Sequence, residues 1–321
     1  MAHLLITGAS GLLGGNLLMQ AREQHRVTAL YHRNMLHLKG VERVGGDLSR
    51  PGEAARIVGS SEPDWVVHCA AATNVDDCER DPERAFRLNR DMARLVAEAA
   101  HAIGARFVQI STDAVFDGKR GDYTERDAPN PINVYGRSKL EGEQAVLKAD
   151  PDALVVRTNL YGWSAQPKDG LAEWFLANLE SGNPCYGFAD ISIAPILATD
   201  LADLLLQMLG ENLRGHYHVV GGECVSKYEF GVKLAKTFTL KPDVIRSVSV
   251  GVAGLAAPRP LRLCLSGEKI EQTLGIRLPG LEEGLGRFKG QREVNYPEHL
   301  KAMLSPPTAQ AIPADLRLGP A

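Results

Sequence analysis

Tyr135 and Lys139 stand four positions apart in a stretch, 135–148, whose residue pattern predicts a helix. Residues with this spacing share one face of a helix, with Cβ atoms about 5–6 Å apart. A lysine charge about 5 Å away contributes roughly 3 kcal/mol at an effective dielectric constant of about 20, and so would lower a tyrosine pKa from about 10 toward about 7. We therefore expect Tyr135 to pass a proton to or from a substrate oxygen, with Lys139 beside it.

A second group of polar side chains follows an apolar strand predicted at 106–111. Ser111 and Thr112 end that strand, and ligands of open parallel sheets lie outside the carboxyl ends of the strands. A hydroxyl at this place can donate a hydrogen bond to a carbonyl oxygen while Tyr135 protonates it. Ordinary packing at a strand end would explain Ser111 or Thr112 alone. Together with Tyr135 and Lys139, these residues predict a catalytic site that acts on a carbonyl or hydroxyl group.

Glycines spaced G-x-x-G-x-x-G occupy the turn between the first predicted strand, 3–7, and the first predicted helix, 12–23. Glycine permits a tight turn and lets the backbone approach a pyrophosphate, whose charge is held by free N–H groups and by the helix dipole. This context, more than the glycines alone, predicts a dinucleotide site. The residues that we expect to bind there are Gly8, Ser10, Gly11, Leu12, Leu13 and Gly14.

The end of the second predicted strand, 26–31, indicates which dinucleotide is preferred. An acid there would bind the ribose 2′-hydroxyl of NAD, but the residues are His32 and Arg33. An arginine can pair with a 2′-phosphate through charge-assisted hydrogen bonds. We therefore expect NADPH as the cofactor, with NADH possible; an ordinary exposed arginine is the alternative.

Two further strand ends are expected to contact the cofactor. Asp47, followed by Leu48, comes after the third predicted strand and could accept a hydrogen bond from the adenine amino group. A turn aspartate is an equally good explanation of Asp47. At the end of the strand predicted at 65–70, small side chains leave room for the cofactor at Ala70, Ala71 and Ala72.

These residues need a scaffold that brings distant positions to one edge of a sheet. Strands predicted at 3–7, 26–31, near 44, 65–70, 106–111 and 153–158 alternate with helices, one of which begins after Asp81 with Pro82 first. Such alternation predicts an α/β fold, a Rossmann-type doubly wound parallel sheet. We expect the charge run at 76–83 to form a solvated loop and the start of a helix.

The second half of the chain is mainly helical in pattern. Helices are predicted at 171–179 and 199–209, and at 230–238 after a capping box of Ser226 and Glu229. We expect residues 1–165 to form the dinucleotide-binding domain. Residues 166–300 would form a smaller, mainly helical substrate lobe, with segments such as 216–220 returning to the sheet. The proline-rich residues 301–321 are expected to form an extended tail.

Composition limits the class of protein. The 321 residues, 44% hydrophobic and 23% charged, suit a globular chain of about two lobes. The net charge of −3 gives no general attraction to nucleic acid or to an acidic membrane, and no apolar run is long enough to span a bilayer. The chain opens on an apolar strand without room for a signal peptide, so we expect a cytoplasmic protein. The five cysteines lack the spacing of a zinc site or a disulfide scaffold, and we expect reduced thiols and no metal.

The combination of motifs resembles the extended short-chain dehydrogenase/reductase superfamily and, within it, most closely the dTDP-4-dehydrorhamnose reductase family. The resemblance runs from the N-terminus to about residue 290 and excludes the tail. It rests on residues 7–14, 70–76, Asn89, 111–113, 115–118, 135–136, 139–143, 157–158 and 257–260, with Leu263 and Leu265.

The resemblance implies reduction of the 4-keto group of a nucleotide-linked 6-deoxysugar by NAD(P)H. By their places in the motifs, Thr112, Tyr135 and Lys139 match the family's catalytic residues: Thr112 would hold the carbonyl, Tyr135 would be the acid, and Lys139 would also bind the nicotinamide ribose. Asn89 matches a helix asparagine near the cofactor. The substrate would contact Thr73, Asn74, Asp113, Asn159 and Arg259, the last at a position that often binds the substrate diphosphate.

Two departures from the family pattern concern the sugar. Ala114 stands where the family has tyrosine, and Leu160 lies where a tryptophan often follows, which removes aromatic surface near the sugar. The familiar deoxyhexose is therefore in doubt as the substrate. The alternatives are a nucleotide-sugar epimerase of the same fold and a non-catalytic, cofactor-binding subunit, since the chain also resembles the β subunit of methionine adenosyltransferase. A homodimer is expected from general base rates.

Overall fold

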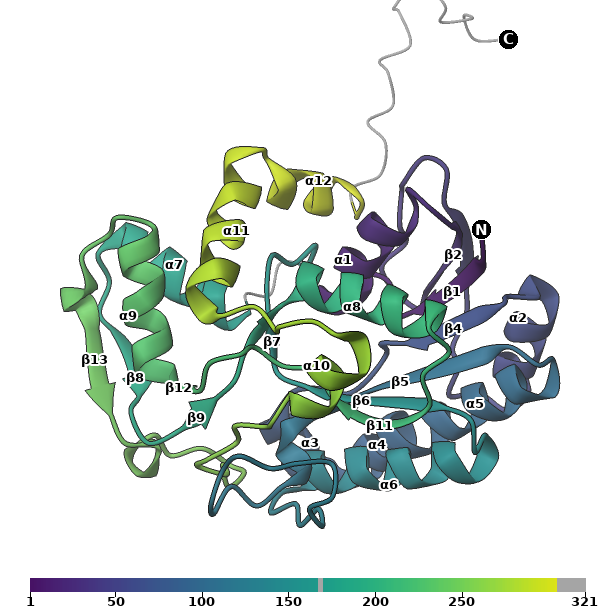
Figure 1. The fold of residues 1–321 in the computed structure, drawn as a ribbon, viewed down its shortest axis with the longest axis horizontal. Helices are drawn as coiled ribbons and strands as arrows, with labels where there is room; N and C mark the ends of the chain where they lie inside the picture. Colours follow the sequence, from purple (N-terminus) through teal and green to yellow (C-terminus); the bar gives the residue numbers. More distant parts are fainter. Residues whose placement is uncertain (167–169, 305–321) are drawn as a thin grey trace, which may run out of the picture.

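The computed structural model describes residues 1–166 and 170–304 of the chain. A parallel seven-stranded sheet, of order β11-β6-β5-β4-β1-β2-β3, forms its centre (Figure 1). Its strands are β1 (His3–Thr7), β2 (Arg26–Tyr31), β3 (Glu42–Gly45), β4 (Trp65–His68), β5 (Arg106–Thr112), β6 (Leu154–Thr158) and β11 (Gly215–His218). The doubly wound Rossmann-type fold predicted from the alternation of strands and helices is confirmed.

Helices cover both faces of the sheet, which explains why the central strands β1 and β4 are largely apolar. On β1, Leu4 and Ile6 belong to one core and Leu5 belongs to the other. The first core is closed by α1 (Leu12–Ala21) and α8 (Ala198–Gly210), and the second by α2 (Glu53–Ser61), α5 (Met92–Ala102) and α6 (Val134–Ala149). Alternate side chains of each strand therefore anchor opposite helical layers.

The segment between β4 and α5 differs from the prediction. The charge run forms a helix, α3 (Val75–Arg80), where a loop was expected, because Asn74 caps it by accepting from the Asp77 N–H. Asp81 then caps α4 (Pro82–Phe86), as predicted, and a π-helical turn at Arg87–Asp91 separates this helix from α5. β4 also ends at His68, two residues earlier than expected.

Most of the remaining elements build a lobe beside the carboxyl ends of the strands (Figure 1). Short strands pair there as β7 (Leu160–Tyr161) with β10 (Ile196–Leu197), β9 (Ser192–Ile193) with β12 (Val225–Ser226), and β8 (Cys185–Phe188) with β13 (Ile245–Val248). Its helices are α7 (Leu171–Ser181), α9 (Lys227–Thr237), α10 (Glu268–Leu274) and α11 (Leu281–Glu293). Of these elements, α7, α9, β8 and β13 lie at the left of Figure 1. The capping box of Ser226 and Glu229 is present at α9.

Parts of the second half of the chain pack on the first half. β11 pairs with β6 at the edge of the sheet, and α8 covers α1. α12 (Tyr296–Ala302) lies against α1, where the Tyr296 hydroxyl donates to Asn16 Oδ1 over 2.9 Å. The tail predicted at 301–321 therefore begins inside α12, and residues 305–321 lie outside the described part of the chain.

One disulfide corrects the expectation of reduced thiols throughout. Cys224 and Cys264, 40 residues apart, are joined, with Cα atoms 5.7 Å apart. Sequence spacing could not reveal this pair, because the fold brings together a loop before β12 and the segment that leads to α10. Cys69, Cys78 and Cys185 are free thiols.

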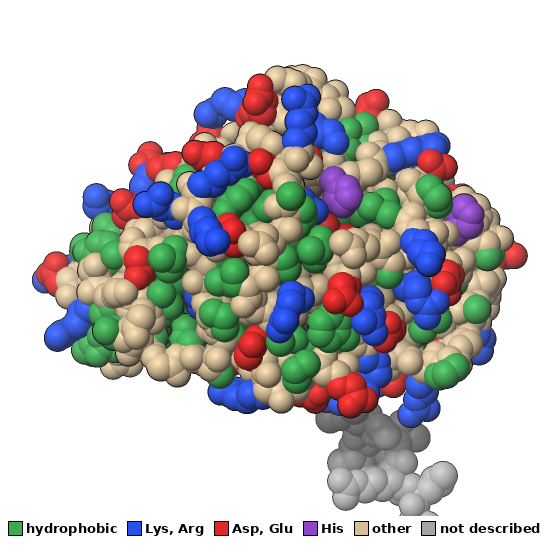
Figure 2. Space-filling view, turned by 90° about the horizontal axis from the view of Figure 1, so that it is seen from below, with side chains coloured by type: hydrophobic (Ala, Val, Ile, Leu, Met, Phe, Trp, Pro, Cys, Tyr) green, Lys and Arg blue, Asp and Glu red, His purple; other side chains and the backbone are tan. Residues whose placement is uncertain are grey.

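The surface gives no sign of one dominant charge on the face seen from below, where acidic and basic side chains are interspersed (Figure 2). Across residues 1–166 and 170–304, we find no helix long and apolar enough to cross a membrane. Within the same residues, no cluster of three or more His, Cys, Asp or Glu side chains could hold a metal ion.

Candidate active site

A cavity of about 740 Å³ opens at the carboxyl ends of β1, β4, β5 and β6. It begins at the glycine turn after β1, passes Tyr135 and Lys139 on α6, and reaches the lobe at the N-terminus of α9. The predicted site residues that line it are Gly8, Ser10, Gly11, Leu12, Leu13, Gly14, Ala70, Ala71, Thr73, Ser111, Thr112, Asp113, Tyr135, Lys139, Asn159 and Arg259. One cavity thus unites both predicted sites.

The turn between β1 and α1 is packed so closely against neighbouring backbone that only glycine fits at two of its positions. Gly8 has φ +61°, and a Cβ atom there would lie 2.7 Å from the Ala70 nitrogen. A Cβ on Gly14 would lie 2.2 Å from the Gly8 carbonyl oxygen. No side chain caps the N-terminus of α1, so its first N–H groups remain for an anion. The turn fits the pyrophosphate of a dinucleotide.

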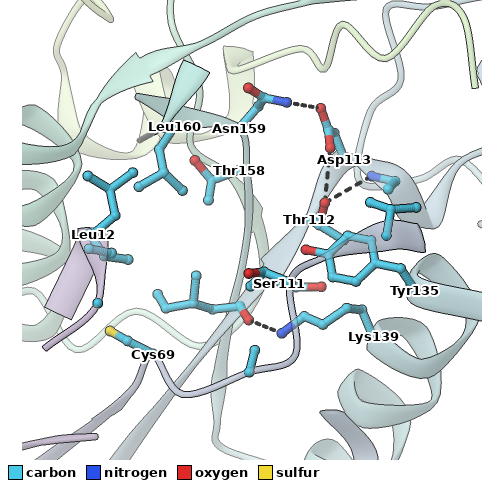
Figure 3. A pocket seen from close by; sticks show the side chains of 18 of the residues that line it. Leu12, Cys69, Ser111, Thr112, Asp113, Tyr135, Lys139, Thr158, Asn159 and Leu160 are labelled. Carbon is cyan, nitrogen blue, oxygen red and sulfur yellow. Dashed lines mark hydrogen bonds between the residues drawn. The ribbon is translucent and has the colours of Figure 1, made fainter. Parts of the chain in front are cut away.

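Lys139 is held below the cavity by the backbone of β5. Its side chain is 3% exposed, and Nζ donates to the Ile110 carbonyl oxygen over 2.6 Å (Figure 3). Burial lowers the pKa of Lys139 to about 8, against the attraction of Glu143. Lys139 therefore has a fixed position and a proton that it can release near neutral pH.

Tyr135 faces the cavity from α6, with its hydroxyl beside Thr112 (Figure 3). Burial raises the pKa of Tyr135 to about 12, the neighbouring Thr112 hydroxyl opposes the rise, and the Asp113 carboxylate adds to it. The predicted fall of the Tyr135 pKa toward 7 is therefore wrong for this structure. Tyr135 and Lys139 share one face of α6, but the Lys139 ammonium donates to the Ile110 carbonyl oxygen. It therefore does not interact strongly with the Tyr135 hydroxyl.

Asp113 is a buried acid at the wall of the cavity, 3% exposed. Its Oδ1 accepts from the Thr112 hydroxyl over 3.0 Å, and its Oδ2 accepts from Asn159 Nδ2 over 2.6 Å (Figure 3). Burial raises the pKa of Asp113 to about 6, although both hydrogen bonds and the Lys227 charge oppose the rise. This carboxyl can therefore hold a proton close to neutral pH.

A second buried acid, Glu143, lies behind the cavity wall. It accepts from Arg157, with Nη2 to Oε2 at 2.7 Å, and from the Ser111 hydroxyl, while His216 Nε2 lies 3.4 Å from it. These partners hold the pKa of Glu143 down at about 2 despite its burial. Ser111 lines the cavity, but its hydroxyl proton is engaged with Glu143, so Ser111 serves to tie the end of β5 to α6.

Comparison with known proteins decides the family. The sequence pattern of the RmlD substrate binding domain matches residues 1–292. The chain belongs to this family. It is 34% identical over 300 residues to the dTDP-4-dehydrorhamnose reductase of Sinorhizobium fredii, covering 89% of this chain and 96% of that protein. It is 32% identical over 300 residues to methionine adenosyltransferase 2 subunit beta of Bos taurus, covering 89% and 88%.

Solved structures agree with this assignment. The dTDP-4-dehydrorhamnose reductase of Bacillus anthracis, solved in complex with NADP, has a TM-score of 0.79 and 30% identity, covering 90% of this chain and 99% of that one. The predicted resemblance to extended short-chain dehydrogenase/reductases, and to the dTDP-4-dehydrorhamnose reductases among them, is confirmed. The matches support an NAD(P)-dependent oxidoreductase.

Some predicted residues of this RmlD-family chain lie outside the cavity lining. His32 and Arg33 are exposed after β2, and Asp47 accepts from the Ser49 N–H and hydroxyl, as a turn aspartate does. Asn89, fully buried, bonds to both backbone groups of Ala72 and to the Ser138 hydroxyl. Leu48 and Ala72 are buried, and Asn74 caps α3.

The cavity also has lining residues that were not predicted as site residues from the sequence. Lys227, the first residue of α9, lies near Asp113, whose charge acts on its amine, and Asn133 caps α6. Arg259 also pairs with Asp76 of α3 over 3.0 Å. No local signal marks Lys227, because a lysine at a helix start is ordinarily a surface residue. Further lining residues are Gln166, Ile191, Ile193, Pro260 and Leu263.

Proposed function

We propose that the protein is an NADPH-dependent reductase of a 4-keto group on a nucleotide-linked deoxysugar, similar to dTDP-4-dehydrorhamnose reductases. The observation that carries the proposal is the single cavity in which Thr112, Tyr135 and Lys139 face the same space as the glycine turn. Gly14 lets α1 pack closely on that turn, and the uncapped N-terminus of α1 would receive the pyrophosphate of a dinucleotide. NADP in the Bacillus anthracis relative and the names of the reductase relatives support the same proposal.

The cofactor would be held by the glycine turn, by Ala70 and Ala71, and by Lys139, which suits the nicotinamide ribose. Bound NADPH would supply the hydride for the ketone carbon. The proposed preference for NADPH over NADH rests on Arg33 and on the lack of an acid after β2.

The chain's own residues would handle the substrate oxygen and its proton. Tyr135 has a high pKa and so carries its proton at neutral pH, as a general acid must. Its proton would pass to the carbonyl oxygen as that oxygen gains negative charge. The Thr112 hydroxyl would orient the carbonyl, and Lys139, fixed by the Ile110 carbonyl, would hold the cofactor beside it.

The part of the cavity away from the glycine turn suits a nucleotide sugar but does not identify which sugar it is. Polar contacts are offered by Asp113, Asn159 and Thr73, and Arg259 at the outer wall suits a diphosphate. Ala114 and Leu160 line the cavity where the family has aromatic residues. We therefore propose a sugar that differs from the familiar deoxyhexose in its bulk at this wall.

The first test measures NADPH oxidation with a panel of nucleotide-linked 4-keto sugars. We expect turnover, and we expect Tyr135→Phe to lower kcat by about 100-fold or more, because the general acid is lost. Tyr186→Phe is the matched control, because Tyr186 is exposed on β8 away from the cavity, and it should leave kcat unchanged. Full turnover in Tyr135→Phe would refute the assignment, and product formation without net NADPH consumption would indicate an epimerase instead.

A regulatory subunit is the second candidate, because the chain is 32% identical to methionine adenosyltransferase 2 subunit beta of Bos taurus. This candidate needs cofactor binding but no turnover. The regulatory subunit would be favoured over the reductase by three results together. These are tight NADPH binding, no NADPH oxidation with any sugar of the panel, and a stable partner enzyme recovered with the protein.

A further inference from the structure

Asp76, the second residue of α3, contacts both the backbone and the side chain of the segment that carries Arg259. Its Oδ1 accepts from the Ala257 N–H over 2.9 Å, and its Oδ2 lies 3.0 Å from Arg259 Nη2. Arg259 in turn donates from Nη1 to the Ala257 carbonyl oxygen over 2.8 Å. Asp76, Ala257 and Arg259 therefore form a closed ring of polar contacts beside the cavity wall that Arg259 lines.

The backbone next to Arg259 is also tied to α6. Asn133 caps α6, and its Nδ2 donates to the Pro258 carbonyl oxygen over 2.9 Å. Tyr135 lies in the first turn of the same helix. The segment that carries Arg259 is therefore held at a fixed place relative to Tyr135.

The guanidinium of Arg259 is oriented by these contacts without being used up. Among the described residues, the cationic side chains that line the cavity are Lys139, Lys227 and Arg259. The Arg259 side chain is 17% exposed, and within the described ranges it bonds to Asp76 and Ala257 only. A guanidinium has five N–H donors in a rigid plane, so further donors remain for an anion in the cavity.

Asp76 has two opposite effects on such an anion. The Arg259 guanidinium holds the pKa of Asp76 below its usual range, the Ala257 N–H adds to this, and burial opposes it. Asp76 is therefore ionised at neutral pH, and its charge repels an anion while its contacts orient the arginine. An arginine side chain has many rotamers, so fixing it before the ligand arrives lowers the entropic cost of binding. We expect orientation to outweigh repulsion.

We propose that Asp76 is a positioning residue for the diphosphate of the substrate, because it orients the Arg259 guanidinium that binds a phosphate oxygen. The inference rests on the proposed function and assigns a residue to the same site. A diphosphate held by Arg259 fixes the reach of the attached sugar toward Tyr135, since Asn133 ties both to α6. Asp76 acts through Arg259 and is not a catalytic residue.

The experiment measures binding of dTDP and of UDP by calorimetric titration of the protein saturated with NADP⁺. Saturation fills the dinucleotide site, so the probe reports on the substrate side of the cavity. We expect the parent to bind at least one probe, and Arg259→Met to weaken that binding about tenfold or more. Asp76→Asn should weaken it about fivefold, because an asparagine oxygen still accepts from the Ala257 N–H but its amide nitrogen cannot accept from Arg259.

A double variant distinguishes action through Arg259 from an independent effect. Asp76→Asn/Arg259→Met should bind the probe within about twofold of Arg259→Met alone. Asp77→Asn is the matched control: it makes the same change in charge on the same helix, but Asp77 pairs with the exposed Arg80 over 3.2 Å. Its probe affinity should equal that of the parent. Tighter probe binding in Asp76→Asn, or effects that multiply in the double variant, would overturn the proposal.

Kinetics and stability separate positioning from a purely structural ion pair. With a confirmed ketone substrate, Asp76→Asn should raise KM about fivefold and leave kcat within about twofold, because the diphosphate is bound alike in the ground state and the transition state. A purely structural pair would lower the thermal midpoint of Asp76→Asn and leave its probe affinity unchanged, and that result also overturns the proposal.

Failure of this proposal and failure of the reductase assignment give different results. If no ketone is reduced but the probe affinities follow the expected pattern, the reductase assignment fails and the role of Asp76 is supported. If the parent reduces a ketone but binds neither dTDP nor UDP, the reductase assignment is supported and the role of Asp76 is overturned.

Discussion

At the scale of single residues, two buried carboxyl groups near the cavity have opposite pKa shifts. Asp113 meets neutral donors, Thr112 and Asn159, and burial raises its pKa to about 6. Glu143 meets Arg157, Ser111 and His216, which hold its pKa down at about 2. The two acids are equally buried, so the partners decide the outcome. Glu143 holds α6 to β5 and β6 through Ser111 and Arg157, while the Asp113 carboxyl can gain or lose a proton near neutral pH.

Cofactor preference also belongs to single residues. Arg33 is exposed after β2, and we propose that it meets the 2′-phosphate of NADPH. We expect Arg33→Ala to weaken NADPH binding about tenfold and to leave NADH binding nearly unchanged, because a charge-assisted pair contributes about 1.5–3 kcal/mol. Fluorescence titration with both cofactors measures the ratio of dissociation constants. A ratio equal to that of the parent would show that Arg33 does not select the cofactor.

At the scale of elements, the turn from β1 to α1 shows how closely packed backbone creates a binding surface. Gly14 lies where any side chain would strike the Gly8 carbonyl, at 2.2 Å, so α1 can approach the turn only with glycine at this position. Gly15, the next residue, would have only ordinary contacts, the nearest at 3.6 Å. Gly14 is therefore required for close packing of α1 on the turn, whereas Gly15 is not.

This contrast gives a paired prediction. Gly14→Ala should displace α1 from the turn and weaken NADPH binding at least tenfold, whereas Gly15→Ala should keep binding and gain up to about 1 kcal/mol of stability from helix propensity. Calorimetric titration and thermal unfolding of both variants provide the measurements. Equal NADPH affinity in the two variants would contradict the role given to Gly14.

At the scale of the whole molecule, the segment at 257–265 links the sheet domain to the lobe. Near α3, the Ala257 N–H donates to Asp76 over 2.9 Å, and the Asn133 amide donates to the Pro258 carbonyl over 2.9 Å. Toward its end, the disulfide joins Cys264 to Cys224 of the lobe. Since Arg259, within this segment, lines the cavity, its position depends on both halves of the chain.

The disulfide should stabilise this arrangement measurably. It closes a loop of 40 residues, for which chain entropy gives roughly 4 kcal/mol. We expect reductant to lower the denaturation midpoint of the parent, and Cys224→Ala/Cys264→Ala to show the lower midpoint with or without reductant. Identical midpoints for the oxidised and reduced parent would argue against a contribution of this bond.

Local patterns determined much of this protein: the glycine turn, the helix that carries Tyr135 and Lys139, and the alternation that predicts the parallel sheet. Each of these features depends on residues a few positions apart, so their periodicity and backbone preferences can be recognised in the sequence. Tertiary structure alone decided where Lys139 directs its charge, which pKa values rise or fall, that Asp113 meets Asn159, and that Cys224 meets Cys264. Burial and partners from distant segments set these properties, and neither is encoded by local spacing.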